Sequence, residues 1–197
     1  MLFALTAASL PVQAYGPKTV SGRVTDPMQK PVKHARVELW DLDGKLDSSV
    51  HTNRRGQFEI RHNACGPCCL EVVPPVRTRL SAALLEDISG DENRSVIVQL
   101  KKGFVVSGRV TSSGKGLSGV IVKVYSSRHA DSRPSRVHGG GAVETGRGGS
   151  FKLVLTPGDK NLVVLNNHYD KLVEQVSTTV SVTSDIDVGT IEVPGKQ

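Results

Sequence analysis

The clearest candidates for chemistry in this 197-residue chain are its three cysteines, Cys65, Cys68 and Cys69, because the first two form a Cys-Gly-Pro-Cys run. Dithiol redox sites use this spacing, but their first cysteine needs a helix N-terminus to stabilise its thiolate. Strand-like residues lie on both sides of the run, so we predict a hairpin turn. A local disulfide of Cys65 with Cys68 or Cys69 suits an exported protein and leaves one cysteine over. An alternative is a metal site formed by these cysteines and His62, although the sequence lacks the second pair of ligands that is usual in such sites.

A second group of candidates lies in the polar stretch 126–142, which is the main insertion of the chain. It contains Arg128, His129, Arg133, Arg136 and His138, and Arg147 follows it. Arginine side chains make two-point contacts with carboxylates and sulfates. This set therefore predicts weak, salt-sensitive binding to an acidic glycan, lost when the stretch is shortened. The alternative is a solvated basic loop, and a metal site at the two histidines with Asp131 is a weaker interpretation.

Trp40 is the only tryptophan of the chain. An exposed indole could stack on a sugar ring, whereas packing in a core or along a strand edge is its commoner role. No nucleophile–histidine–acid arrangement and no pair of carboxylates is recognisable from the spacing. We therefore predict a protein that is not an enzyme and needs no cofactor or metal.

The elements that must position these residues form a repeat. Val20-Ser-Gly-Arg-Val-Thr25 returns as residues 106–111, and Thr52-x-x-x-Gly-x-Phe58 returns as Thr145-x-x-x-Gly-x-Phe151. A supersecondary unit repeated at this length indicates two tandem copies of one small domain. We place them at residues 17–102 and 103–197. The connection Lys101-Lys-Gly103 is too short to be a free linker, so the two copies should touch.

Each copy shows the alternation of apolar and polar residues that is typical of half-buried strands. Phe58 and Phe151 fall on the inward positions of equivalent strands and should be buried. Residues 79–88 also fit a helical face, but we assign them to a strand with an irregular end. With aromatic residues at only 4%, the core must consist mainly of Val, Leu and Ile, which suits small all-β sandwiches.

Charge and hydropathy narrow the classes of partner. The net charge of +6 is spread over both copies, and no basic helix or aromatic–basic pattern suggests nucleic-acid binding. Residues 1–14 form a short apolar start that ends in Val-Gln-Ala, a pattern typical of a signal peptide. No stretch is long enough to span a bilayer. We therefore expect a secreted, periplasmic or cell-surface protein that does not insert into the membrane once the signal is removed.

The repeated motifs, with Pro31-Val-x-x-Ala-x-Val-x-Leu-Trp40 and Pro157-Gly158, resemble the carboxypeptidase regulatory-like domains. These are relatives of the transthyretin (prealbumin-like) and Cna-B-type sandwiches. The resemblance implies two tandem seven-stranded Greek-key β-sandwiches. It also implies a non-catalytic structural or protein-interaction module. We expect this module to be a monomer whose partner is an unknown surface protein or, through the basic stretch 126–142, an acidic glycan.

Cna-B-type relatives can carry an internal Lys–Asn isopeptide bond, which requires a lysine on an early strand and an asparagine on the last strand. The first copy offers Lys18, but its predicted last strand, residues 95–100, has no asparagine. The second copy has no lysine in residues 105–111. We therefore expect no such bond in either copy.

Overall fold

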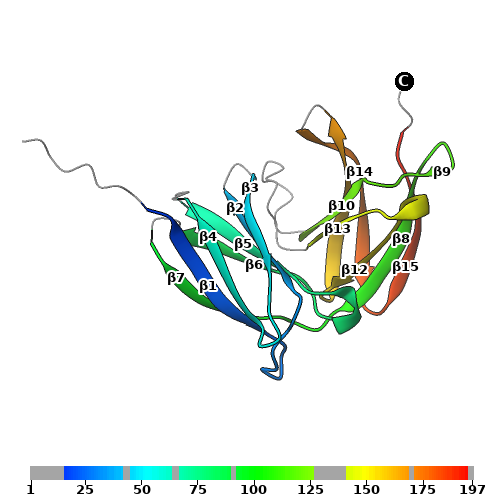
Figure 1. Cartoon of the computed structure of the whole chain (residues 1–197). Coiled ribbons are helices and arrows are strands. Elements are labelled where there is room, and N and C mark those ends of the chain that lie inside the picture. The colour runs from blue at the N-terminus through cyan, green and yellow to red at the C-terminus, as the bar shows by residue number, and fades with distance from the viewer. Residues whose placement is uncertain are drawn as a thin grey trace, which may run out of the picture.

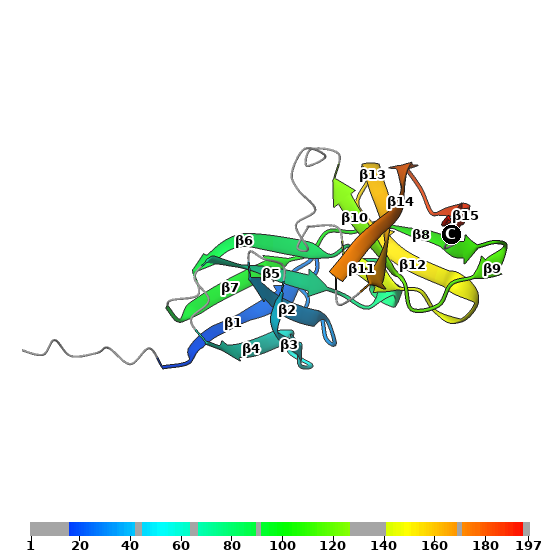
Figure 2. The ribbon, with the colours of Figure 1, turned by 90° about the horizontal axis from the view of Figure 1, so that it is seen from above.

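The computed structural model describes residues 16–41, 45–63, 67–89, 92–126, 141–168 and 171–194. Strands dominate these residues, which confirms the predicted all-β class. Strands β1–β7 and β8–β15 form two neighbouring groups, seen side by side in Figure 1 and from above in Figure 2. We call these groups the N-terminal and C-terminal sandwiches.

The N-terminal sandwich packs a three-stranded sheet on a four-stranded sheet. The first sheet has the order β4-β1-β7 and the second β3-β2-β5-β6. Their bounds are β1 Lys18–Thr25, β2 Arg36–Asp41, β3 Leu46–His51, β4 Gln57–His62, β5 Pro67–Val73, β6 Ala83–Ser89 and β7 Arg94–Gln99. Strand β1 pairs with β4 antiparallel and with β7 parallel.

The C-terminal sandwich repeats this plan. Its sheets have the orders β12-β8-β15, with β9 paired to β8, and β11-β10-β13-β14. Their bounds are β8 Phe104–Ser112, β9 Lys115–Gly116, β10 Ile121–Ser126, β11 Ala142–Glu144, β12 Ser150–Leu155, β13 Gly158–His168, β14 Lys171–Val182 and β15 Ile186–Glu192. Strand β8 pairs with β15 in parallel, as β1 pairs with β7.

Two short segments differ from the sequence-based prediction. The strand expected over residues 79–88 begins only at Ala83, because the chain first makes the 3₁₀ turn η1 (Val76–Thr78) and passes through Arg79 in a left-handed conformation, φ 55°. Strand β3 was not predicted as a separate strand. It has a single inward apolar residue, Val50, and its exposed, largely polar sequence resembles a loop.

The repeated motif residues hold the same framework together in both sandwiches. Thr52 accepts a hydrogen bond from Ala35 N–H at 2.9 Å and donates one to the Val32 carbonyl at 2.7 Å. Thr145 makes the equivalent bonds with Val120 N–H, at 3.1 Å, and the Leu117 carbonyl, at 2.7 Å. Each threonine thus satisfies two buried backbone groups where the chain enters β2 or β10.

The motif glycines and phenylalanines pack against each other across strands. Phe58 lies opposite Gly22, and a Cβ on Gly22 would lie 2.9 Å from the ring. Phe151 covers Gly108 in the same way, at 2.8 Å. Both rings are buried, as predicted, at 6% and 3% exposure. Glycine therefore makes room for the ring, which closes the core over that strand.

Each sandwich has its own hydrophobic core of mainly aliphatic residues, one built from β1–β7 and one from β8–β15. Four further buried apolar residues belong to neither core: Cys69, Val154, Val163 and Leu165. Val163 and Leu165 flank Val164 on β13, whose side chain faces the C-terminal core, so they point to the opposite face of the sheet. Their burial shows that this outward face is covered.

Candidate functional site

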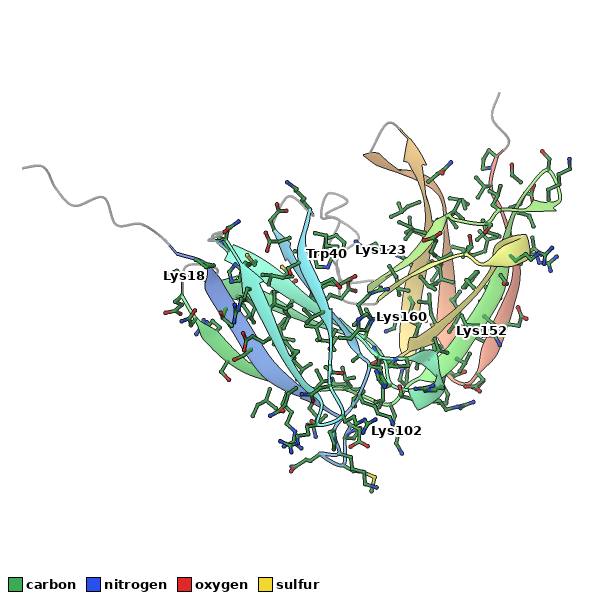
Figure 3. The ribbon with its side chains drawn as sticks, viewed as in Figure 1. Lys18, Trp40, Lys102, Lys123, Lys152 and Lys160 are labelled. Carbon is green, nitrogen blue, oxygen red and sulfur yellow. The ribbon has the colours of Figure 1, made fainter. Side chains whose placement is uncertain are left out.

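The outward faces of the two four-stranded sheets meet at a junction between the sandwiches. On β2 the core residues Val37 and Leu39 alternate with Arg36, Glu38 and Trp40, so these three face outward. On β10 the core residues Val122 and Val124 alternate with Ile121 and Lys123. Figure 3 shows Trp40 and Lys123 in the space between the two groups of strands.

Charged side chains are buried at this junction. Glu38 and Glu71 are cross-strand neighbours on β2 and β5, with 8% and 5% exposure, and Lys123 is 4% exposed. Arg36 forms an ion pair with Glu38, with 2.8 Å between Nε and Oε1. The cluster therefore joins two carboxylates of one sandwich to an ammonium group of the other.

Burial, and after it the charge of the neighbouring Glu38 carboxylate, raises the pKa of Glu71 from 4.5 to about 7. Lys123, Arg36 and the backbone N–H of Gly141 oppose this rise in the pKa but do not cancel it. A carboxyl group taken out of water prefers its neutral form. Glu71 is thus close to half-protonated at neutral pH.

Gly141 ends a run of three glycines at the end of the stretch 126–142, and such a run could let the backbone approach a ligand closely. Instead, it approaches the N-terminal sandwich: its N–H donates to the Glu71 carboxyl, and a Cβ on it would lie 3.1 Å from the Cβ of Ala82. Its φ of +84° also lies in the left-handed region that favours glycine. This residue brings the start of β11 against the other sandwich.

A second contact between the sandwiches lies near η1. The guanidinium of Arg79 donates to both carboxylate oxygens of Asp185, which also accepts a hydrogen bond from Val105 N–H at 3.0 Å. These two donors, the Val105 amide first, hold the pKa of Asp185 below its usual value. In addition, Gly103 N–H donates to the Arg79 carbonyl at 3.0 Å. The connection between the sandwiches is therefore tied to both of them.

A cavity of about 350 Å³ opens at the junction. Its walls come from both sandwiches, and its charged or aromatic lining residues are Arg36, Glu38, Trp40, Glu71, Lys123, Glu144 and Lys152. The rest of the lining is mostly aliphatic. The volume lies within the range of small-molecule sites.

The predicted site residues do not form one group. Trp40 lines the junction cavity and is partly buried, so it is neither a core residue nor a freely exposed stacking surface. Arg147 is exposed in η3 (Arg147–Gly149) and does not line that cavity. The other members of the predicted acidic-glycan site, Arg128, His129, Arg133, Arg136 and His138, lie outside the described residues, as does Cys65. The glycan site stays a prediction.

The cysteine run has a structural role where it is described. Cys68 is disulfide-bonded and fully buried in β5, and Cys69 is a buried thiol. A disulfide sulfur is no thiolate ligand, which argues against the metal site with His62. Among the described residues, no three His, Cys, Asp or Glu side chains are grouped as metal ligands. Cys68 also lacks the helix N-terminus that a redox thiolate needs.

Sequence reasoning missed Glu38, Glu71 and Lys123. They alternate with core residues on half-buried strands, which is the ordinary pattern of a solvent-facing position. The signal that could have revealed them is the short connection at residues 101–103, which requires one face of each sandwich to meet the other.

One segment of the chain matches the model of a known protein family. Residues 19–83 match the family model described as carboxypeptidase regulatory-like domain, which confirms the resemblance for that segment. No curated protein matches the chain.

Among solved structures, the shaft pilin SpaA from Lactobacillus rhamnosus GG matches with 10% identity and a TM-score of 0.37, over 92% of this chain and 99% of that chain. A streptococcal ancillary pilin matches with 15% identity and a TM-score of 0.35, over 91% and 62%. The minor pilin GBS52 from Streptococcus agalactiae matches with 13% identity and a TM-score of 0.34, over 91% and 97%. Similarity at this level carries no functional argument. Within the described residues, no helix is long and apolar enough to cross a membrane.

Proposed function

We propose that this chain is an exported, non-catalytic module whose two β-sandwiches act as one rigid unit for structural support or for docking to a surface protein. The observation that carries the proposal is the burial of the outward-facing Glu38, Glu71, Lys123, Val163 and Leu165 at the junction. Side chains on the outer faces of independent domains would be solvated. Their burial supports a fixed spacing between the two sandwiches.

The bonds around Arg79 add to this rigidity. Arg79 and Asp185 are each about half exposed, so their ion pair contributes little free energy by itself. The two parallel hydrogen bonds of this ion pair nevertheless fix the orientation of one sandwich relative to the other. The Val105 amide donates a third hydrogen bond to the same carboxylate. The connection is therefore anchored on both sides and differs from a flexible linker.

The test is a distance distribution between the sandwiches. Spin labels would be attached at Glu59 on β4 and Asp187 on β15, which are both exposed. The distance between the labels would be measured in the full chain by pulsed electron–electron double resonance. We expect one narrow distance peak. A broad distribution would show that the sandwiches move independently, and the rigid-unit proposal would then fail.

The interaction role is tested separately. The immobilised full chain would be exposed to the surface-protein fraction of its source cells, with an Arg79→Ala/Asp185→Ala variant as the loosened control. Selective retention of a defined protein by the intact chain would support docking to the rigid unit. Recovery of no partner, together with monomeric behaviour at high concentration, would contradict the interaction role.

A further inference from the structure

The junction cavity combines a large aliphatic wall with a few polar atoms. Its volume of about 350 Å³ is enough for a small organic molecule. The wall is formed by side chains from both sandwiches: Val73, Pro74, Val76, Leu80, Ile121 and Leu165. Such a surface favours the hydrocarbon part of a ligand, because its burial removes apolar area from water.

Two buried polar atoms of the cavity walls have no hydrogen-bond partner in the described part of the chain. They are Nε1 of Trp40 and Oε1 of Glu71. Glu71 is only 5% exposed, and although the Gly141 N–H donates to its carboxyl group, Oε1 keeps no partner. A buried polar atom without a partner costs free energy, so it needs an explanation, such as a ligand atom in the adjoining cavity.

These two atoms are placed so that one ligand group can reach both. Glu38 on β2 pairs with Glu71 on β5, and Trp40 lies two residues beyond Glu38. Trp40 and Glu71 are therefore diagonal neighbours on the outward face, at a spacing that aromatic and long side chains can bridge. The indole N–H only donates, and an ionised carboxyl group only accepts. A hydroxyl group matches both, because its oxygen accepts from Trp40 while its O–H donates to Glu71.

The charges at the junction favour a neutral ligand. Arg36 and Glu38 form an ion pair, and the positive charge of Lys123 acts on Glu71, whose pKa it lowers. Each of these four groups therefore already faces a group of opposite charge. An ionic ligand would bring a further charge out of water, at a high cost in free energy. The other charged residues of the lining are exposed to water: Glu144 and Lys152.

We propose that the junction cavity binds a compact aliphatic alcohol, whose hydrocarbon part lies on the aliphatic wall and whose hydroxyl group bridges Trp40 Nε1 and Glu71 Oε1. The site rests on the fixed junction proposed above, because its walls come from both sandwiches. The spin-label measurement tests that junction without any ligand. A narrow distance peak together with no alcohol binding would therefore overturn the ligand site alone.

Protonation of Glu71 changes which neutral ligands fit. Burial and then Glu38 raise its pKa to about 7, whereas Lys123, Arg36 and the Gly141 N–H lower it. The protonated carboxyl group can donate to a ketone oxygen, which only accepts, but the ionised group cannot. Ketone binding should therefore follow the protonated fraction, and its apparent dissociation constant should increase up to about tenfold between about pH 6 and about pH 8. An alcohol fits both forms, so its dissociation constant should change less than about twofold over this interval.

Cyclohexanol is a suitable probe, with cyclohexanone as the matched ligand that only accepts and with cyclohexanecarboxylate and cyclohexylammonium as the matched ions. The full chain would be titrated with each by calorimetry at both pH values. At the higher pH we expect cyclohexanol to bind at least about fivefold more tightly than cyclohexanone and at least about tenfold more tightly than either ion. Equal binding of cyclohexanol and cyclohexanone there would overturn the hydroxyl bridge. Tighter binding of either ion would overturn the choice of a neutral ligand, and no binding of cyclohexanol would overturn the site.

Two variants and a control complete the test. Trp40→Phe keeps an aromatic ring but lacks the N–H, so it should bind cyclohexanol about fivefold more weakly, and unchanged binding would refute the role of the indole. Glu71→Gln keeps a donor and an acceptor but does not titrate, so cyclohexanone binding should no longer depend on pH. Glu59→Gln on β4, exposed and outside the cavity, should behave as the unmodified chain. An unchanged pH dependence of cyclohexanone binding in Glu71→Gln would refute the role of Glu71, even if Trp40→Phe fails to fold.

Discussion

Replacing Glu71 by glutamine should change how the stability of the protein depends on pH. The pKa of Glu71 is about 7 in the folded chain, against 4.5 for an exposed glutamate. Below pH 4.5 the group is protonated in both states, so the folded state keeps its full stability. As the pH rises from 4.5 to about 7, the unfolded state has released the proton while the folded state still holds it, so the free energy of unfolding falls.

The magnitude follows from the same two values. One pKa unit corresponds to about 1.4 kcal/mol, so the difference between 4.5 and about 7 corresponds to a loss of about 3 kcal/mol across this interval. That is a large part of the stability of a small domain, which is typically about 5–15 kcal/mol. Glu71→Gln has no proton to release and should lose this contribution to the pH dependence. Above pH 7 it should be more stable than the unmodified chain.

The assay is urea unfolding at a series of pH values between about 4.5 and 8, followed by Trp40 fluorescence. The informative quantity is the difference between the unmodified chain and Glu71→Gln, because contributions from all other groups cancel in this difference. Glu144→Gln, which removes an exposed carboxylate of the same cavity, is the matched control and should change little. Parallel stability curves for the unmodified chain and Glu71→Gln would refute the argument that burial controls this carboxyl group.

Three further predictions concern the repeated framework. Phe58→Ala and Phe151→Ala should each lower the free energy of unfolding by about 3–5 kcal/mol in denaturant titrations, because each removes a ring packed over a glycine; an unchanged unfolding midpoint would contradict this packing. Thr52→Val and Thr145→Val should each lower the free energy of unfolding by about 1–3 kcal/mol for every backbone group left without a partner. Replacement of the same threonines by serine keeps the hydroxyl group and should lower it less. Equal losses for valine and serine would contradict the hydrogen-bonding role. Gly149→Ala should destabilise the fold strongly, because φ is +81° and the added Cβ would lie 2.1 Å from the Val110 carbonyl oxygen. Gly114→Ala, at a residue with a similar φ but with open space around it, should destabilise less. A lower melting temperature for Gly114→Ala than for Gly149→Ala, measured by circular dichroism, would contradict this.

The framework was predictable because its residues have local and repeated reasons for their type. The glycine under each phenylalanine and the threonine at each chain reversal recur at the same spacing in both copies, so the sequence shows them twice. Strand β3 was missed because one inward residue, Val50, is too weak a signal of alternation. The late start of β6 depends on the turn at η1 and on the conformation of Arg79, which neighbouring residue types do not determine.

The junction could not be predicted from alternation, because an outward residue looks the same in a sequence whether water or another sandwich covers it. Comparison of the two copies contains the missing information. Strands β2 and β10 are equivalent and have the same length, and Trp40 corresponds to Tyr125. Glu38 therefore corresponds to Lys123: the copies carry opposite charges at the same outward position of the same strand.

Opposite charges at equivalent positions have a physical consequence. Two identical outward faces would bring like charges together, which is costly away from water. In this chain, divergence at the outward positions of β2 and β10 makes the faces complementary, while the inward positions, Val37 and Leu39 against Val122 and Val124, stay aliphatic. One charge has no oppositely charged counterpart in the other copy. Glu71 on β5 pairs with Glu38, and the equivalent residue of the second copy, which pairs with Lys123, is Val163 on β13. The carboxyl group left without an equivalent partner is the one with the raised pKa, and it lines the cavity.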